Sequence, residues 1–121
     1  DLRELLPTRP GVQTAAPAEP VLLPAAVATE LAAAVSAAVD NALTHGGRRA
    51  WLLVEDLPEA VVVSVRDDGP GIAPGRLEQA ERDGRMGVAR SIRGRLEDLG
   101  GTVSVVSTAG QGTEVELRVG R

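Results

Sequence analysis

The sequence predicts an α+β fold in which helices pack on one face of a mainly antiparallel sheet. Two observations support this. A helical pattern over residues 24–45 is followed by two β-rich runs with a four-residue connection, and a second helical pattern over 88–99 is followed by two more. Because strands joined by so short a connection pair antiparallel, the order is helix, hairpin, helix, hairpin.

The composition indicates one soluble globular domain of 121 residues. Its core must be aliphatic, because Trp51 is the single aromatic residue. The net charge of -4 provides no sequence-wide attraction to nucleic acid or anionic membranes, so we expect neither as a partner. There is no cysteine or lysine and only one histidine, which excludes disulfides, thiolate or multi-histidine zinc sites and a P-loop lysine.

Residues 1–20 contain four of the eight prolines, which predicts a linker. A short edge strand at 12–15 fits this pattern. Residues 2–6 fit the tail of an upstream helix that lies outside this sequence. We therefore divide the chain into a linker, 1–20, and a folded domain, 21–121. No signal peptide or apolar run of spanning length is visible, so we expect this piece to be cytoplasmic, which is compatible with a membrane anchor elsewhere in a longer parent.

The helix over 24–45 starts at Pro24 and places Asn41 and His45 four residues apart, hence on one face. Each has an ordinary structural explanation, Asn41 as a helix-end residue and His45 as a cation facing the helix dipole. The strands that follow are 50–55 and 61–66.

The strand 61–66 ends in two adjacent acids, Asp67 and Asp68, and then in a turn that contains Gly69 and Gly71. Buried carboxylates cost free energy unless they are paired, and glycine lets a bound group approach the backbone closely. The junction is either a ligand site or a plain acidic turn.

The segment 73–85 is polar, with at most one helical turn over 76–81, and we expect it to be mobile. The glycine-flanked start of the second helix presents backbone N–H groups of the kind that bind phosphate. Gly100-Gly101 ends that helix, and the last two strands are 102–108 and 113–119.

Four segments occur in a specific order, and together they resemble the N, G1, G2 and G3 boxes of sensor histidine kinase catalytic domains: Asn41-Ala42-Leu43-Thr44-His45, Asp67-Asp68-Gly69-Pro70-Gly71-Ile72, Gly84-Arg85-Met86-Gly87-Val88 and Gly110-Gln111-Gly112-Thr113. The superfamily also includes Hsp90, type II topoisomerase and MutL ATPases and anti-sigma-factor serine kinases. The resemblance covers about 21–119. It implies a two-layer Bergerat-type fold, with a mixed, mainly antiparallel sheet of about five strands and about three helices on one face.

The resemblance implies an adenine site built on one carboxylate. Asp67 would accept a hydrogen bond from the exocyclic amine of adenine, which guanine lacks at that position, so the nucleotide would be ATP. Gly69, Gly71 and Ile72 would line the base, and Thr113 would support Asp67 or bind adenine through water. Asp68 stands where many relatives have Asn, and we interpret it as a turn-stabilising residue.

The resemblance also implies a phosphate and metal site. Asn41 would be a ligand of Mg²⁺, with His45 one turn further on facing a phosphate. The phosphate clamp would be completed by the start of the second helix: Arg85, Met86, Gly87 and Val88. The segment 73–85 would be the ATP lid.

Two departures from the family pattern concern the chemistry of transfer. Ala37 stands four residues before Asn41, where many relatives have an acidic or amide residue that helps to activate the acceptor. Asp40 is rotated by about 100° from the face of Asn41, so it is a poor replacement. At Thr44 related kinases often carry a basic residue. We assign no catalytic base.

The whole kinase would transfer the γ-phosphoryl group of ATP to a histidine on a separate dimerisation domain. The implied partners are that domain and a response regulator; the isolated domain would be a monomer and the parent a homodimer. Three alternatives stay open: a nucleotide-binding pseudokinase module that lacks efficient transfer because of Ala37, an anti-sigma-factor serine kinase, and a scaffold that binds no nucleotide.

Overall fold

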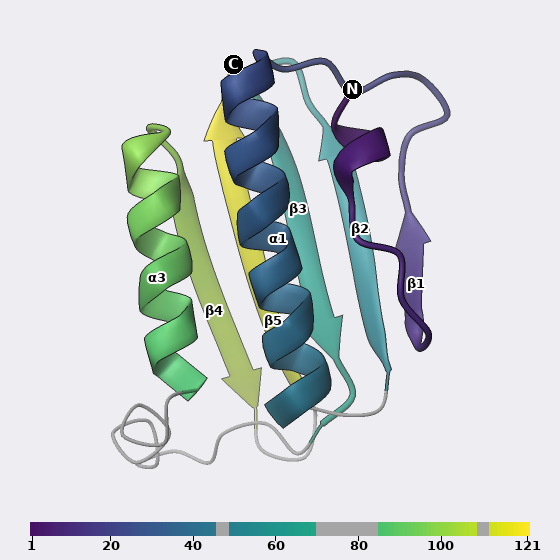
Figure 1. The fold of residues 1–121 in the computed structure, drawn as a ribbon, viewed down its shortest axis with the longest axis vertical. Helices are drawn as coiled ribbons and strands as arrows, with labels where there is room; N and C mark the ends of the chain where they lie inside the picture. The colour runs from purple at the N-terminus through teal and green to yellow at the C-terminus, as the bar shows by residue number, and fades with distance from the viewer. Residues whose placement is uncertain (46–48, 70–84, 109–111) are drawn as a thin grey trace.

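The computed structural model describes residues 1–45, 49–69, 85–108 and 112–121 (Figure 1). In these ranges the chain forms a five-stranded sheet in the order β1-β2-β3-β5-β4. The strands are β1 (Val12–Ala15), β2 (Ala50–Asp56), β3 (Ala60–Asp67), β4 (Thr102–Thr108) and β5 (Gly112–Gly120). Helices α1 (Ala25–His45) and α3 (Arg85–Asp98) cover one face, and the short 3-10 helix η1 (Leu2–Leu5) lies beside α1. The two-layer α+β architecture is confirmed.

The strand pairing is mixed and mainly antiparallel, as expected. β2 pairs with β3, β3 with β5 and β5 with β4, all antiparallel, so both predicted hairpins are confirmed. The edge strand β1 matches the range proposed from the sequence and runs parallel to β2, with Val12 opposite Ala50. The described residues contain two α-helices and one 3-10 helix; the helical turn predicted over 76–81 lies outside them.

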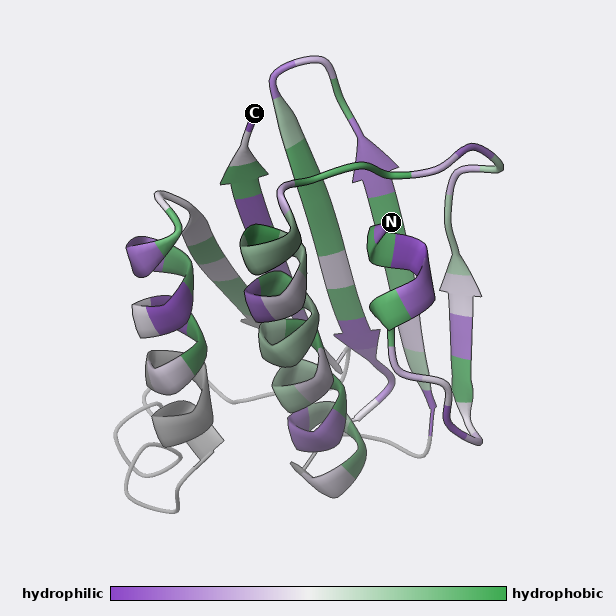
Figure 2. Cartoon of the chain, turned by 45° about the horizontal axis from the view of Figure 1, so that its top comes forward, coloured by the Kyte–Doolittle hydropathy of each residue, from purple (hydrophilic) through white to green (hydrophobic). Residues whose placement is uncertain are grey.

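The core lies between the sheet and the two helices and is entirely aliphatic, as the composition predicted. From Thr113 to Gly120 the burial along β5 alternates, because one face of the strand packs on the helices and the other does not. β3 is different, since its side chains from Ala60 to Val65 are buried on both faces. Figure 2 shows this central strand as the most continuously apolar one.

Helix α1 packs across the middle of the sheet, with Leu31, Val35 and Val39 fully buried. The span Ala25–Thr44 is also long and apolar enough to cross a membrane, by length and composition alone. The sequence reading that no such run exists was therefore wrong. The alanine-rich composition raises the hydropathy of this helix, and its packing against β3 is that of a core helix.

Helix α3 ends as its glycines predicted. Gly100 has a positive φ of 73°, and the N–H of Gly101 donates to the carbonyl of Leu96 at 2.7 Å. The N–H of Gly100 also donates to the carbonyl of Glu97 at 2.9 Å, and the two bonds form the Schellman motif that glycine favours at helix ends. Ile92 and Leu96 carry the buried stripe of this helix.

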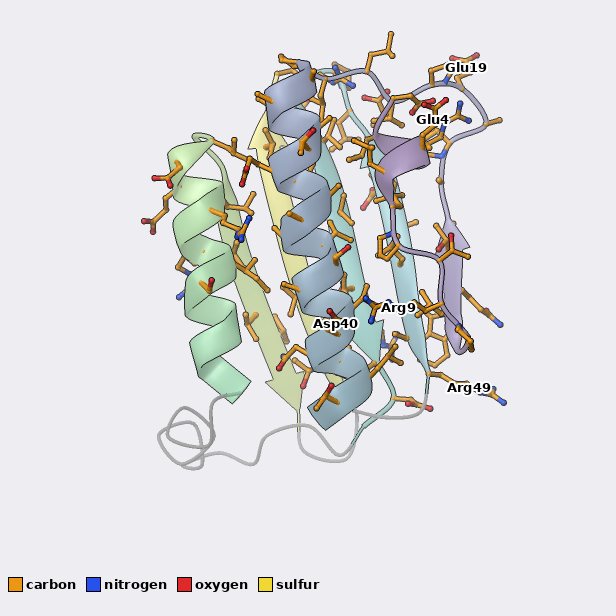
Figure 3. The ribbon with its side chains drawn as sticks, viewed as in Figure 1. Glu4, Arg9, Glu19, Asp40 and Arg49 are labelled. Carbon is orange, nitrogen blue, oxygen red and sulfur yellow. The ribbon has the colours of Figure 1, made fainter. Side chains whose placement is uncertain are left out.

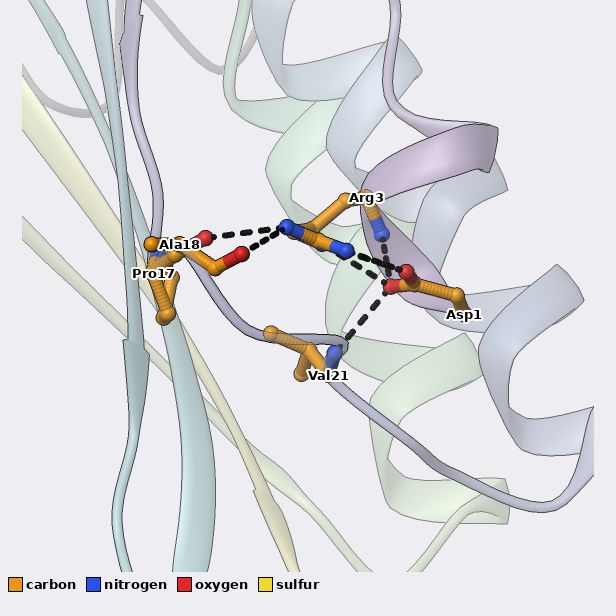
Figure 4. A network of polar contacts seen from close by, with 5 residues as sticks. All are labelled: Asp1, Arg3, Pro17, Ala18 and Val21. Atoms are coloured by element: carbon orange, nitrogen blue, oxygen red, sulfur yellow. Dashed lines mark hydrogen bonds and ion pairs between the residues drawn. The ribbon is translucent and has the colours of Figure 1, made fainter.

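Some of the first 20 residues are held against the domain. Leu2 is fully buried in the core, and its N–H donates to the carbonyl of Val21 at 2.9 Å. Asp1 Oδ1 accepts from the backbone N–H groups of Arg3 and Val21, while Arg3 donates to the carbonyls of Pro17 and Ala18 (Figure 4). We call these contacts the N-terminal clasp. Residues 2–5 form one 3-10 turn held by the domain; the boundary at residue 20 stays a prediction.

Candidate functional site

The predicted site segments converge on one end of the two layers. The C-terminal ends of α1 and β3 and the N-terminal ends of α3 and β5 all lie at the lower end of Figure 1, opposite the two chain termini. Each of these four ends carries a predicted box: the N box at the end of α1, the G1 box at the end of β3, the G2 box at the start of α3 and the G3 box at the start of β5. The fold thus brings together segments that are up to about 70 residues apart in the chain.

Asp67 is the last residue of β3 and is buried, with 3% of its surface exposed. Its Oδ1 accepts hydrogen bonds from the backbone N–H of Gly69 at 2.9 Å and of Thr113 at 3.3 Å. One donor belongs to the turn that follows β3 and the other to β5. Two independent backbone elements therefore hold the carboxylate in place, as a recognition group requires.

Gly112 makes this arrangement possible. Its φ is +88°, and a Cβ built on it would lie 2.1 Å from the backbone oxygen of Asp67, closer than any real contact. Glycine alone meets both requirements, since it tolerates positive φ and carries no side chain. The sequence assigns Gly112 to the predicted G3 box but does not place it against Asp67. Its position directly before Thr113 is the only signal that could have pointed there.

Asn41 lies on α1 near its C-terminal end, and its Oδ1 is buried without a hydrogen-bond partner among the described residues. Buried side-chain acceptors are nearly always paired, so this oxygen needs an account. An amide oxygen is a suitable ligand for Mg²⁺. The unpaired acceptor fits the metal-ligand role expected of this residue.

Asp40, the neighbour of Asn41, faces elsewhere. Its carboxylate pairs with Arg9 in the turn before β1, on the side of α1 that faces β1 and β2 (Figure 3). This agrees with the rotation expected between adjacent helix residues. Ala37 lies partly buried against the core.

Asp68 is exposed, and its Oδ1 accepts a hydrogen bond from the backbone N–H of Arg49 at 3.2 Å. Arg49 directly precedes β2, so Asp68 ties the start of that strand to the end of β3. The sequence reading described Asp68 as a turn residue and did not identify this partner, because nothing local specifies it.

The other predicted site residues are described only in part. His45 is the last residue of α1, and Arg85, Met86, Gly87 and Val88 form the first turn of α3, but their side chains are not described. Gly69 is buried beside Asp67. Gly71, Ile72 and the segment 73–84 lie outside the described residues. Among the described residues, no cluster of three or more His, Cys, Asp or Glu side chains could hold a metal ion alone.

Comparison with known proteins agrees with this geometry. Residues 26–121 match the HATPase_c family, described as Histidine kinase-, DNA gyrase B-, and HSP90-like ATPase. The chain is 42% identical over 95 residues to the sensor histidine kinase GtrS of Pseudomonas aeruginosa, an alignment that covers 69% of this chain and 19% of GtrS.

Two solved structures share the fold. The blue-light activated histidine kinase of Erythrobacter litoralis EL346 superposes with a TM-score of 0.71 at 26% identity, over 92% of this chain and 36% of that one. A structure of the histidine kinase domain of the same protein gives a TM-score of 0.67 at 26% identity, over 92% of this chain and 52% of that one. This chain spans only part of each relative. It belongs to the histidine kinase-, DNA gyrase B- and HSP90-like ATPase family, as an ATP-binding catalytic domain of the kind found in sensor histidine kinases.

Proposed function

We propose that ATP binds at the end of the sheet where Asp67 and Asn41 lie, and that Asp67 accepts a hydrogen bond from the exocyclic amine of adenine. The observation that carries this proposal is the buried Asp67 carboxylate, held by the backbone N–H groups of Gly69 and Thr113. A carboxylate accepts hydrogen bonds, so it favours the exocyclic amine that adenine carries at the position where guanine has an oxo group. Thr113 supports Asp67 through its backbone, and Gly69, Gly71 and Ile72 line the base.

Asn41 is the proposed ligand of Mg²⁺, because its buried oxygen has no protein partner among the described residues. A bound Mg²⁺ neutralises charge on the triphosphate. His45 and the first turn of α3, from Arg85 to Val88, are placed by their elements at the same end and face the phosphates in this proposal.

In the longer parent protein we propose that the γ-phosphoryl group is transferred to a histidine on a separate dimerisation domain, and from there to a response regulator. The histidine kinases among the relatives support this assignment. The acceptor is not His45, the single histidine of this chain, since that residue belongs to the nucleotide site. The domain then acts as a monomer on the cytoplasmic side within a homodimeric parent.

A second candidate is a module that binds ATP without efficient transfer. Two observations favour it: Ala37, four residues before Asn41, carries no polar group, and the carboxylate of Asp40 is paired with Arg9. The parent protein, incubated with labelled ATP and Mg²⁺, distinguishes the two. Acid-labile phosphohistidine supports transfer, and its persistent absence supports the binding module.

ATP binding is tested on this chain by calorimetry with Asp67→Asn. The substitution keeps an acceptor for the two backbone N–H groups but removes the charge and one acceptor oxygen, so we expect ATP affinity to fall about tenfold to a hundredfold. Asp68→Asn is the matched control, because it preserves the acceptor for Arg49 and lies outside the proposed contact to adenine. Unchanged affinity in Asp67→Asn, or equal losses in both variants, contradicts the adenine assignment.

A further inference from the structure

The face of the sheet that carries no helix among the described residues contains a cavity, with a volume of about 590 Å³. It spans β2, β3 and the start of β5, and it borders the proposed ATP site at Asp67; its lining is Trp51, Leu53, Ser64, Arg66, Asp67, Asp68 and Glu114. Side chains alternate between the faces of a strand, and the neighbours Leu52, Val63 and Val65 belong to the core under the helices. The cavity therefore opens on the opposite side of the sheet from the core, and its volume is typical of small-molecule sites.

The hollow arises from one small residue on a central strand. Ser64 pairs with Leu53 of β2 on one side and with Glu116 of β5 on the other. Only 7% of Ser64 is exposed. Its hydroxyl makes no hydrogen bond to any described residue and forms the polar floor of the cavity.

One wall is apolar and includes the single aromatic residue of the chain. Trp51 is only partly buried and stands outside the aliphatic core. Leu53, two residues further along β2, is 44% exposed. An indole ring beside an exposed leucine offers a surface for a large apolar group.

Strands β3 and β5 contribute two opposite charges to the cavity, those of Arg66 and Glu114. Arg66 lies between Trp51 and Glu114 in the strand register. Although they face each other across the strands, Arg66 and Glu114 form no hydrogen bond or ion pair with any described residue, nor with each other. Asp68 adds a second carboxylate at the same end of the cavity. A ligand can therefore engage a guanidinium and a carboxylate without displacing an existing ion pair.

We propose that this cavity binds a free amino acid with a large apolar side chain. Its carboxylate pairs with Arg66 in a bidentate contact, its ammonium group lies between Glu114 and Asp68, and its side chain packs on Trp51 and Leu53. A zwitterion is attracted to the guanidinium and to the carboxylates at the same time. A simple anion is repelled by the two carboxylates, and a simple cation is repelled by Arg66.

The test uses L-phenylalanine on the nucleotide-free chain, so that no bound ATP competes near Asp67, which borders both sites. Trp51 is the sole tryptophan and tyrosine is absent, so the fluorescence of the indole reports on this cavity alone. We expect a saturable change, with calorimetry as a second measurement. N-acetyl-L-phenylalanine lacks the ammonium group and L-phenylalaninamide lacks the carboxylate, and each should bind about tenfold more weakly.

Two variants assign each charge to its partner. Arg66→Gln should lower the affinity for phenylalanine about tenfold, to about the affinity for phenylalaninamide. Glu114→Gln should lower the affinity for phenylalanine to about the affinity for the N-acetyl compound. Arg118→Gln and Glu116→Gln are matched controls from the exposed face of β5, outside the cavity lining, and should bind as the wild type does. Lack of saturable binding by both measurements, equal binding of the three ligands, or equal losses in the control variants would overturn the proposal.

Discussion

The polar groups compared at the two ends of the sheet differ in whether they have hydrogen-bond partners within the protein. At the end with the chain termini, Asp1 accepts from two backbone N–H groups and Arg3 donates to two carbonyls, so the N-terminal clasp satisfies its own polar atoms. At the opposite end, the buried oxygen of Asn41 has no partner among the described residues. Proteins rarely leave a buried acceptor unpaired, so the difference separates an end that stabilises the fold from an end that is completed by a ligand.

The largest expected effect tests whether the clasp end stabilises the fold. Leu2→Ala removes a fully buried side chain and should lower the free energy of unfolding by about 3 kcal/mol, as measured by urea denaturation. Leu5→Ala, on the same 3-10 helix but 46% exposed, should change it by less than about 0.5 kcal/mol. Similar values for the two variants would show that residues 1–5 do not stabilise the domain.

An intermediate effect is expected at the site end, where Gly112 contacts Asp67. Gly112→Ala places a methyl group against the Asp67 carbonyl at a positive φ, so we expect a loss of about 2 kcal/mol in stability together with weaker ATP binding. Gly120→Ala is the matched control at the other end of β5, where a Cβ meets nothing within 4 Å. Wild-type ATP affinity in Gly112→Ala would mean that Asp67 does not need this close approach.

The smallest effect on stability is expected for Asn41. Because its Oδ1 has no described partner, Asn41→Ala should change the free energy of unfolding of the nucleotide-free chain by less than about 0.5 kcal/mol. The same variant should lose the Mg²⁺-dependent part of ATP affinity in calorimetry. Arg3→Ala provides the contrast at the clasp end, where loss of paired groups should cost about 1 kcal/mol. A large destabilisation by Asn41→Ala would mean that the fold itself uses this amide.

Much of the local structure could be predicted because it depends on residues close in sequence. The three- and four-residue spacing of Leu31, Val35 and Val39 predicts α1, and the β-branched run ending at Asp67 predicts β3. The cap of α3 at Gly100 likewise depends on a few adjacent residues.

The tertiary contacts of residues 1–20, which the sequence pattern indicates as a linker, could not be predicted from neighbouring residues. Proline density correctly argued against a continuous helix, but it carries no information about tertiary partners. The burial of Leu2 depends on α1 and on Val21, which lie far along the chain. The hydropathy of α1 was also misjudged, since alanine contributes to it without adding the large side chains of a typical membrane span.

The sequence by itself determined the order of helices and strands, the aliphatic core and the candidate residues Asn41 and Asp67. Only the tertiary structure decided what surrounds them: Asp67 accepts from Thr113, 46 residues away, beside a glycine at positive φ, and Asn41 has no described partner. The physical reason is that periodicity and turn chemistry act over a few residues. The partners of a buried polar group depend instead on which strands become neighbours, here β3 and β5.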